Sequence, residues 1–342
     1  MQNTIAEQKP NVITPHKTVS RIPYTSRLLE YRSEWTLAVL IVVIFAVGPL
    51  VTEYFFTLDN LFNLSRQASY LAIVSVGMAL VLIVGGIDLS IGAVMQLVGL
   101  CSVLLLALGL PAWAVLILAL MMGGGLGLIN GILTVYGRIQ PFIATLATAG
   151  IMTGIVMTYT QGNGVAPRGI DPGFRFIGGG TIAGIPIPAA FMLLVFVVFW
   201  WLMSRTVYGR SIYSLGSNVH AARNVGVNVK VLECSVYALS GVLAALAGYL
   251  TSARSGTFQP ATAATGGTPV EVVIMAIAAI VLGGGSLSGG KGTIVGAFLG
   301  ALVSAIMLNF LVLLGMGIWF QRFILALIII AVVIVARRSK GA

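Results

Sequence analysis

Charged residues are scarce in this 342-residue sequence, since Asp, Glu, Lys and Arg together make up only 8% of it. Soluble domains average about 25% charged residues, so this composition excludes an ordinary soluble domain. Hydrophobic residues make up 58% of the chain, and apolar runs of about 20 residues recur between residues 35 and 336. No strict alternation of the kind found in membrane β-barrels is visible. The sequence therefore predicts an all-α, polytopic integral membrane protein.

The sequence has only two cysteines, and combinations of residues that carry catalysis are also scarce. Cys101 and Cys234 both lie in apolar runs, which argues against a disulfide framework and against a cysteine metal site. The run GSLSGGKG at 285–292 resembles a phosphate-binding loop, but Gly292 stands where a hydroxyl is needed. With no Ser–His–Asp set and no carboxylate pair in view, we expect a chain that is not an enzyme and binds no cofactor or metal.

The apolar runs predict about ten membrane spans, each long enough to approach the thickness of a bilayer. We place them near residues 35–52, 68–84, 89–109, 112–134, 141–160, 188–204, 233–252, 270–284, 293–314 and 319–336. The resulting domains are an N-terminal tail (1–34), a single transmembrane domain (35–336) and a short C-terminal tail (337–342).

The basic residues orient these spans. If both tails are cytoplasmic, 14 of the 19 Lys and Arg residues fall on the cytoplasmic side, as the positive-inside rule requires. No small-residue cleavage site follows the basic N-terminal tail, so the first apolar run is expected to be a span. Because the basic residues are spread over several short segments, we expect no nucleic-acid partner.

Glycine is abundant, with 42 residues that lie mostly inside apolar runs. Two hairpins, at 79–100 and 278–300, each consist of an apolar run, a glycine cluster and another apolar run. Helices broken at such clusters leave backbone groups free to line a transport pathway, although a tight turn would also explain them. The outer loop 161–187 is rich in Gly and Pro and is either a binding loop, a cap or a solvated connector.

A polar segment at 205–232 is strongly basic and contains no acid. Its Asn218 is suited to cap a short helix, and Gly226 is suited to end it. The small side chains of Ala221 and Ala222 would allow a close approach by another protein, and Arg223 could bind a carbonyl or carboxylate there. The segment therefore looks like a cytoplasmic loop built to be held by a partner.

Four blocks of the chain resemble the permeases of bacterial ribose-type ATP-binding-cassette (ABC) importers. They lie at 55–99 (with GGIDLS at 85–90), 130–148, 206–254 (with GSNVHAARNVG at 216–226) and 276–302. Branched-chain amino-acid permeases are related and share weaker versions of the last block.

The resemblance implies a multi-pass subunit of the bacterial inner membrane that translocates a monosaccharide or a similar polyhydroxylated solute by alternating access. It implies a second permease copy, a cytoplasmic ABC ATPase that holds the ATP and Mg, a periplasmic sugar-binding protein and the lipid bilayer as partners. The residues that match the family's ATPase-coupling segment are Gly209, Arg210, Gly216, Asn218, Ala221, Ala222, Arg223 and Gly226.

Polar residues inside or beside the spans are candidates for the substrate pathway. A carboxylate at membrane depth is costly and usually functional, although Asp is also a favoured helix cap. We take Asp88, Ser90, Asn130, Gln140 and Thr145 as the candidate pathway residues. Each of the neutral ones could instead make a simple helix–helix hydrogen bond.

One departure from the resemblance bears on specificity. Relatives commonly carry acids where this chain has Val273 and Met275, and the nearest acid here is Glu271. Two other transport functions therefore stay open: a branched-chain amino-acid ABC permease, and a secondary transporter that needs no ATPase. A membrane-embedded enzyme is a further alternative, which the absence of a catalytic set disfavours.

Overall fold

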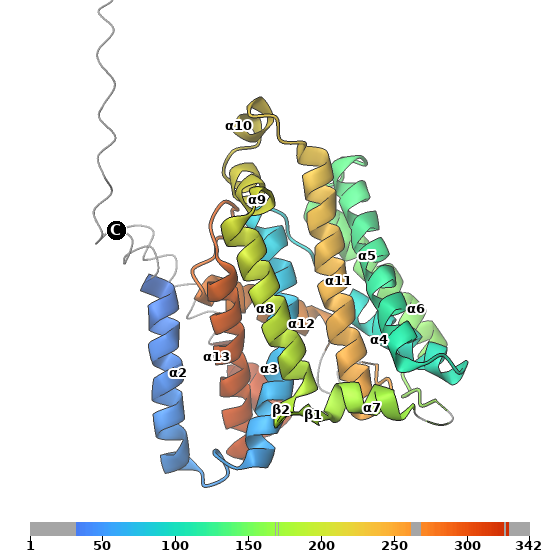
Figure 1. Cartoon of the computed structure of the whole chain (residues 1–342), viewed down its shortest axis with the longest axis vertical. Helices are drawn as coiled ribbons and strands as arrows, with labels where there is room; N and C mark the ends of the chain where they lie inside the picture. Colours follow the sequence, from blue (N-terminus) through green and yellow to red (C-terminus); the bar gives the residue numbers. More distant parts are fainter. Residues whose placement is uncertain (1–31, 168, 170, 261–267, 325, 328–342) are drawn as a thin grey trace, which may run out of the picture. The chain divides into compact units, whose positions relative to one another are not determined.

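The computed structural model of the chain is a bundle of long helices (Figure 1). It describes residues 32–167, 169, 171–260, 268–324 and 326–327. The helices are α2 (Arg32–Val51), α3 (Leu58–Ile83), α4 (Ile91–Ala107), α5 (Ala112–Val135), α6 (Pro141–Thr160), α7 (Pro172–Gly179), α8 (Ile187–Arg205), α9 (Val207–Ser217), α10 (Val219–Asn224), α11 (Val229–Ser255), α12 (Pro269–Leu282) and α13 (Ile294–Leu313). The strands that the structure describes, β1 (Thr181–Ile182) and β2 (Ile185–Pro186), form a single short antiparallel hairpin.

Local sequence signals set several helix starts. Thr57 and Thr293 cap α3 and α13 through their hydroxyl groups, and Pro141 opens α6, where its missing N–H is not needed. Thr268 and Glu271 form a reciprocal capping box at the start of α12.

Seven of the described helices are long and apolar enough to cross a membrane. They coincide with seven of the predicted spans, so the prediction of a mostly helical membrane protein is confirmed. The predicted spans at 89–109 and 270–284 appear as the shorter α4 and α12, of 17 and 14 residues. The predicted span at 319–336 begins within a helical stretch but lies largely outside the described residues, as do both tails. The count of ten spans stays a prediction.

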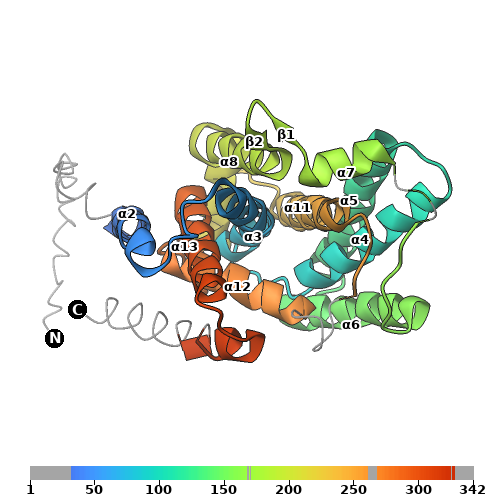
Figure 2. The ribbon, with the colours of Figure 1, turned by 90° about the horizontal axis from the view of Figure 1, so that it is seen from below.

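Two helices form the centre of the bundle, and others surround them. Among residues in the apolar windows, 78% of those in α3 and 67% of those in α11 are buried, against 11% in α2. Figure 2 shows α3 and α11 enclosed by α4, α5, α8, α12 and α13. The described helices belong to one compact unit that starts at Ser33.

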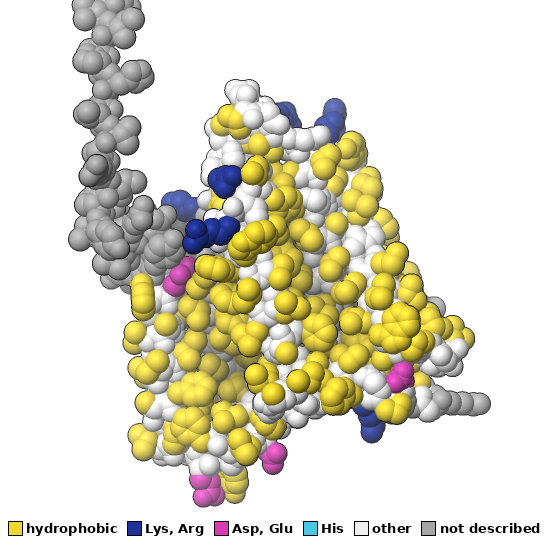
Figure 3. Space-filling view, in the orientation of Figure 1, with side chains coloured by type: hydrophobic (Ala, Val, Ile, Leu, Met, Phe, Trp, Pro, Cys, Tyr) yellow, Lys and Arg dark blue, Asp and Glu magenta, His cyan; other side chains and the backbone are white. Residues whose placement is uncertain are grey.

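The outer helices turn apolar side chains outward. Val42 on α2, Trp113 on α5 and Ile151 on α6 are each more than 60% exposed. Figure 3 shows a largely hydrophobic surface, with most of the visible Lys and Arg side chains at the end that carries α9 and α10. Such a surface is suited to lipid and not to water.

Glycine allows α5 and α11 to pack backbone to backbone. A Cβ on Gly131 would lie 2.8 Å from Cys234 Cα, and Cβ atoms on Gly123 and Gly127 would overlap α11 itself. The spacing of four residues places the three glycines on one face of α5. This pattern of small residues is typical of tightly packed membrane helices.

Part of the loop at 161–187 packs on the helical bundle, although most of its described residues are exposed. Asp171 begins α7 by accepting a hydrogen bond from Gly173 N (2.6 Å), and its other oxygen accepts one from Ala112 N (2.9 Å). Phe174 of α7 packs edge-on against Tyr249 of α11, with ring centroids 5.1 Å apart. The loop therefore covers this end of α11.

Candidate functional site

Asp88 is the centre of a buried polar network. It lies in the link between α3 and α4 and is 1% exposed. Its carboxylate accepts hydrogen bonds from Ser90 N (2.9 Å), Ser90 Oγ (2.6 Å) and Ser240 Oγ of α11 (3.2 Å). The N-cap position of α4 is Ser90 and not Asp88, and no side chain caps the helix there; Asp88 instead accepts the N–H of Ser90, just before the helix begins.

The network continues through Asn130 into α6. Asn130 Nδ2 donates to Ser90 Oγ (2.6 Å), and Thr148 Oγ1 donates to Asn130 Oδ1 (2.7 Å). Asn130 belongs to α5 and Thr148 to α6. A continuous chain of hydrogen bonds therefore joins α11, the α3–α4 link, α5 and α6.

Thr145 makes a second connection between α6 and the same link. Its hydroxyl oxygen accepts a hydrogen bond from Leu89 N (3.1 Å) and lies 2.8 Å from Pro141 O, to which it donates. Four of the five candidate pathway residues thus meet in one place.

Gln140 is the exception. Its side chain is exposed at the start of α6 and makes no capping hydrogen bond there. Ser240 and Thr148, by contrast, were not among the candidates and belong to the network. A polar residue in an apolar span must find a partner, and that rule applied to every serine and threonine would have included both.

In this structure the polar groups of the network form hydrogen bonds with one another and are closed to solvent. Asp88, Ser90 and Asn130 are all 1% exposed or less, and each makes hydrogen bonds to other members. A solute could reach them only if α11, α5 and α6 moved apart from the α3–α4 link. Within the described residues, no group of three or more His, Cys, Asp or Glu side chains is placed to hold a metal ion.

The segment at 205–232 folds as its caps predict. Asn218 Oδ1 accepts from Ala221 N (3.0 Å) and begins α10, and Gly226 follows the helix with a φ of 85°, a conformation that favours glycine. Arg210 and Arg223 are exposed. Gly209 is buried against the backbone of Met203, so closely that a Cβ at this position would overlap it.

The pairing of Ala221 with Ala222 as one outward face is wrong. Ala221 is exposed, but Ala222 is 0% exposed and packs into the chain itself. Successive residues of an α-helix point about 100° apart, so neighbours in a six-residue helix rarely share a face. The outward small residue of α10 is Ala221.

Gly216, at the end of α9, contacts the end of α3 and the glycine cluster of the α12–α13 link. A Cβ on Gly216 would overlap Ile83 O, at the end of α3, and would lie 2.9 Å from Gly290 N. Gly290 N itself donates to Ile83 O (2.8 Å), and a Cβ on Gly289 would lie 2.9 Å from Gly85 Cα. We call these five residues the glycine junction.

Tyr213, one turn before Gly216, strengthens this contact. Its hydroxyl donates to Gly292 O (2.9 Å) in the α12–α13 link. The two glycine clusters therefore touch each other and the basic segment, which resemblance and spacing alone did not predict.

Val273 and Glu271 take different positions at the start of α12. Val273 is 1% exposed, so an acid there would have to be buried. Glu271 caps α12 and pairs with Arg322, with an N–O distance of 3.4 Å.

A bundle of apolar helices, broken at glycines beside a buried polar network, with a basic helical segment packed on the breaks, defines a multi-pass membrane transport subunit. The family of branched-chain amino acid transport system permease components matches residues 60–333, and the chain belongs to this family.

Named relatives align along almost the whole chain. The chain is 39% identical over 309 residues to the ribose import permease protein RbsC of Haemophilus influenzae, which covers 90% of this chain and 93% of that protein. It is 38% identical over 328 residues to the RbsC protein of Escherichia coli K12, covering 95% and 99%. It is 35% identical over 303 residues to the D-allose transport system permease protein AlsC of the same organism, covering 88% and 90%.

Proposed function

We propose that this chain is the permease subunit of an ABC importer in the bacterial inner membrane and that its solute is a monosaccharide. The names of the relatives support the sugar, and the family supports the transport role. The single observation that carries the mechanism is the contact of Gly216, in the basic segment, with the end of α3 and with the glycine cluster of the α12–α13 link.

The proposed mechanism is alternating access driven from outside the chain. An ATPase subunit that binds and hydrolyses ATP with Mg would hold α9 and α10 on the cytoplasmic side. Gly216 contacts Ile83, the last residue of α3, and the α12–α13 link, and Tyr213 contacts the α12–α13 link as well. A displacement of α9 would therefore be passed to both, and through the contact of Gly289 with Gly85 to the α3–α4 link. Ligands shift such an equilibrium only by binding its states unequally, so the ATPase would supply the energy.

The network around Asp88 is the proposed gate on the substrate pathway. Ser90, Asn130 and Thr145 offer hydroxyl and amide groups that match the hydroxyls of a sugar, once the hydrogen bonds among them separate. The proposed arrangement has ten spans with both termini in the cytoplasm, a second permease copy, and a periplasmic binding protein at the face that carries α7.

Uptake of radiolabelled ribose into proteoliposomes tests the proposal. The chain would be reconstituted with the ATPase and binding protein encoded beside it, and we expect uptake only with ATP inside or at the ATPase face. Leucine as the effective competitor would indicate an amino-acid permease. Uptake by the chain alone, driven by a proton or sodium gradient, would indicate a secondary transporter.

A pair of substitutions tests the docking face. Ala221→Trp places a large side chain on the exposed side of α10, so we expect weaker co-purification of the ATPase from a folded permease. Ala222→Trp places the same side chain in the permease's own packing, so we expect a lower yield of folded protein. If both variants were obtained at normal yield and bound the ATPase equally well, the assignment of α10 as the docking helix would be contradicted.

A further inference from the structure

A cavity lies beside the basic segment, at the ends of two membrane helices. It encloses about 710 Å3 and is lined by the end of α5, the α10–α11 link and the first turns of α11. It is separate from the Asp88 network, because none of the network residues lines it.

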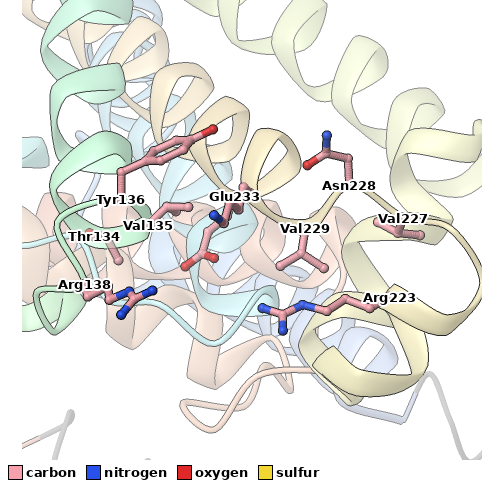
Figure 4. Close-up of a pocket in the computed structure, with 10 residues that line it drawn as sticks. Thr134, Val135, Tyr136, Arg138, Arg223, Val227, Asn228, Val229 and Glu233 are labelled. Carbon is pink, nitrogen blue, oxygen red and sulfur yellow. The ribbon is translucent and has the colours of Figure 1, made fainter.

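Four charged side chains surround this cavity: Arg138, Arg223, Lys230 and Glu233. In Figure 4, Arg138 and Arg223 extend into the cavity from opposite sides, and Glu233 lies between them. Within the described residues none of these four charges makes an ion pair within 4.0 Å, although Arg223 is close enough to attract the carboxylate of Glu233. All four face a shared volume. They provide three positive charges and one negative charge.

Arg138 is held there at a conformational cost. It has a φ of 53° just past the end of α5, where Ile139 N closes the helix end on Leu133 O (3.3 Å). This left-handed conformation is unfavourable for any residue other than glycine. The attraction of a cation to the helix C-terminus offsets part of that cost, and the rest implies a use for the side chain.

Exposed apolar residues stand next to the lining residues in the chain. Tyr136 lines the cavity and is 56% exposed, Ile132 lies one turn earlier on α5 and is 45% exposed, and Val231, which follows the lining residue Lys230, is 58% exposed. Lys230 Nζ lies 5.3 Å from the centre of the Tyr136 ring. A bound phospholipid needs a polar site for its headgroup and an adjoining apolar surface for its acyl chains. A cationic cavity beside exposed apolar residues of a membrane helix provides both.

We propose that this cavity binds the headgroup of a phosphatidylethanolamine molecule of the adjacent leaflet. Its phosphate contacts the guanidinium groups of Arg138 and Arg223 and the ammonium of Lys230, and its ethanolamine ammonium contacts Glu233. The acyl chains lie along Ile132 and Tyr136. An acidic side chain of a partner protein would leave Glu233 without a cation, whereas the ethanolamine ammonium supplies one next to the phosphate.

Native mass spectrometry of the full-length purified chain tests the site. Delipidated protein would be titrated with phosphatidylethanolamine, phosphatidylglycerol or phosphatidylcholine, and the fraction carrying lipid measured. We expect the ethanolamine lipid to bind most tightly. Arg138→Gln and Lys230→Gln should each weaken its binding about fivefold, as one juxtamembrane cation contributes about that factor.

Glu233→Gln gives the sharper test. Removal of the carboxylate should abolish the preference for ethanolamine and raise the binding of phosphatidylglycerol, whereas loss of a cation should weaken both lipids. Lys291→Gln is the matched control, because Lys291 is exposed at the α12–α13 link and does not line the cavity. Size-exclusion chromatography checks that each variant is folded.

Two results would overturn the proposal. The first is equal binding of all three lipids by the unaltered chain with no effect of any variant. The second is unchanged lipid binding by Arg138→Gln together with lost co-purification of the ATPase, which would assign the cavity to a carboxylate of the partner protein.

Discussion

The α3–α4 link is held by two joints of opposite character. On one side, Asp88 and Ser90 bind α11 and α5 through side-chain hydrogen bonds. On the other, Ile83 and Gly85 meet Gly216 and the α12–α13 link through backbone alone. Side-chain hydrogen bonds can exchange partners one at a time, whereas closely packed backbone segments, here also joined by the hydrogen bond from Gly290 N to Ile83 O, stay together or separate as a whole. The polar joint is therefore suited to open and close, and the glycine junction to transmit movement.

The largest expected effect comes from adding atoms to the backbone joint. Gly216→Val places a branched side chain where even a Cβ would overlap Ile83 O. Overpacking in a tight core costs about 1–3 kcal/mol or more, so we expect ATP-driven uptake to fall at least about tenfold. Radiolabelled uptake, normalised to folded protein, measures this.

The matched control is Gly154→Ala on α6, where the added Cβ would meet no atom within 4 Å. We expect its uptake to equal that of the unaltered chain. If Gly216→Val retained full uptake as well, α9 would not be in backbone contact with α3, and the comparison of the two joints would fail.

Removing the centre of the polar joint should have the next largest effect. Asp88→Ala leaves Ser90 N and two serine hydroxyls buried without their acceptor, and each such group costs about 1–3 kcal/mol. We expect the midpoint of thermal unfolding of the detergent-solubilised chain to fall clearly. Asp88→Asn keeps an acceptor oxygen, so we expect its unfolding midpoint to fall by less than that of Asp88→Ala. Equal losses for the two variants would show that charge and not hydrogen bonding holds this joint.

A single bond within the polar joint should contribute much less. Thr148 Oγ1 donates to Asn130 Oδ1 (2.7 Å), and hydrogen bonds between membrane helices average about 0.6 kcal/mol. A double-mutant cycle of Asn130→Ala and Thr148→Val should give a coupling energy near that value. A coupling energy of zero would mean that the two side chains do not act together.

The smallest effect is expected at a half-buried ion pair near the surface, which sharpens the contrast with both buried joints. The side chains of Arg322 and Glu271 are 22% and 31% exposed, and ion pairs near the surface contribute about 0.2–1 kcal/mol. Arg322→Gln should therefore hardly change the midpoint of thermal unfolding. Added salt should make the small difference between this variant and the unaltered chain smaller still. A loss as large as that of Asp88→Ala would contradict this ranking.

Much of the polar joint could be predicted from sequence, because a polar side chain in an apolar span needs a partner. Asp88, Ser90, Asn130 and Thr145 were identified on that ground and do meet. The same rule marks Ser240 as a residue that needs a partner, but nothing local to α11 shows that this partner is a carboxylate 152 residues away. Gln140 carried the same polar signal but lies just outside α6, where it is exposed.

The backbone joint was far less accessible to sequence analysis. The two glycine clusters are visible as patterns, but their contact with Gly216 depends on the packing of segments distant in the chain. Sequence analysis also could not show which side of α10 faces outward, because a six-residue helix has too few residues to show a hydrophobic period. Its caps, Asn218 and Gly226, were predictable because they act within a few residues.

A pair of distances tests most directly the claim that the glycine junction moves as a unit with α9 and α10. Spin labels at Val219 and Leu287, both exposed, would report across the junction, and labels at Val219 and Ile151 would report from α10 to α6. Cys101 and Cys234 would first be replaced by serine. With the ATPase bound, pulsed electron paramagnetic resonance would measure both distances with and without ATP. The account predicts that the first distance stays constant while the second changes; a first distance that changes as much as the second would contradict it.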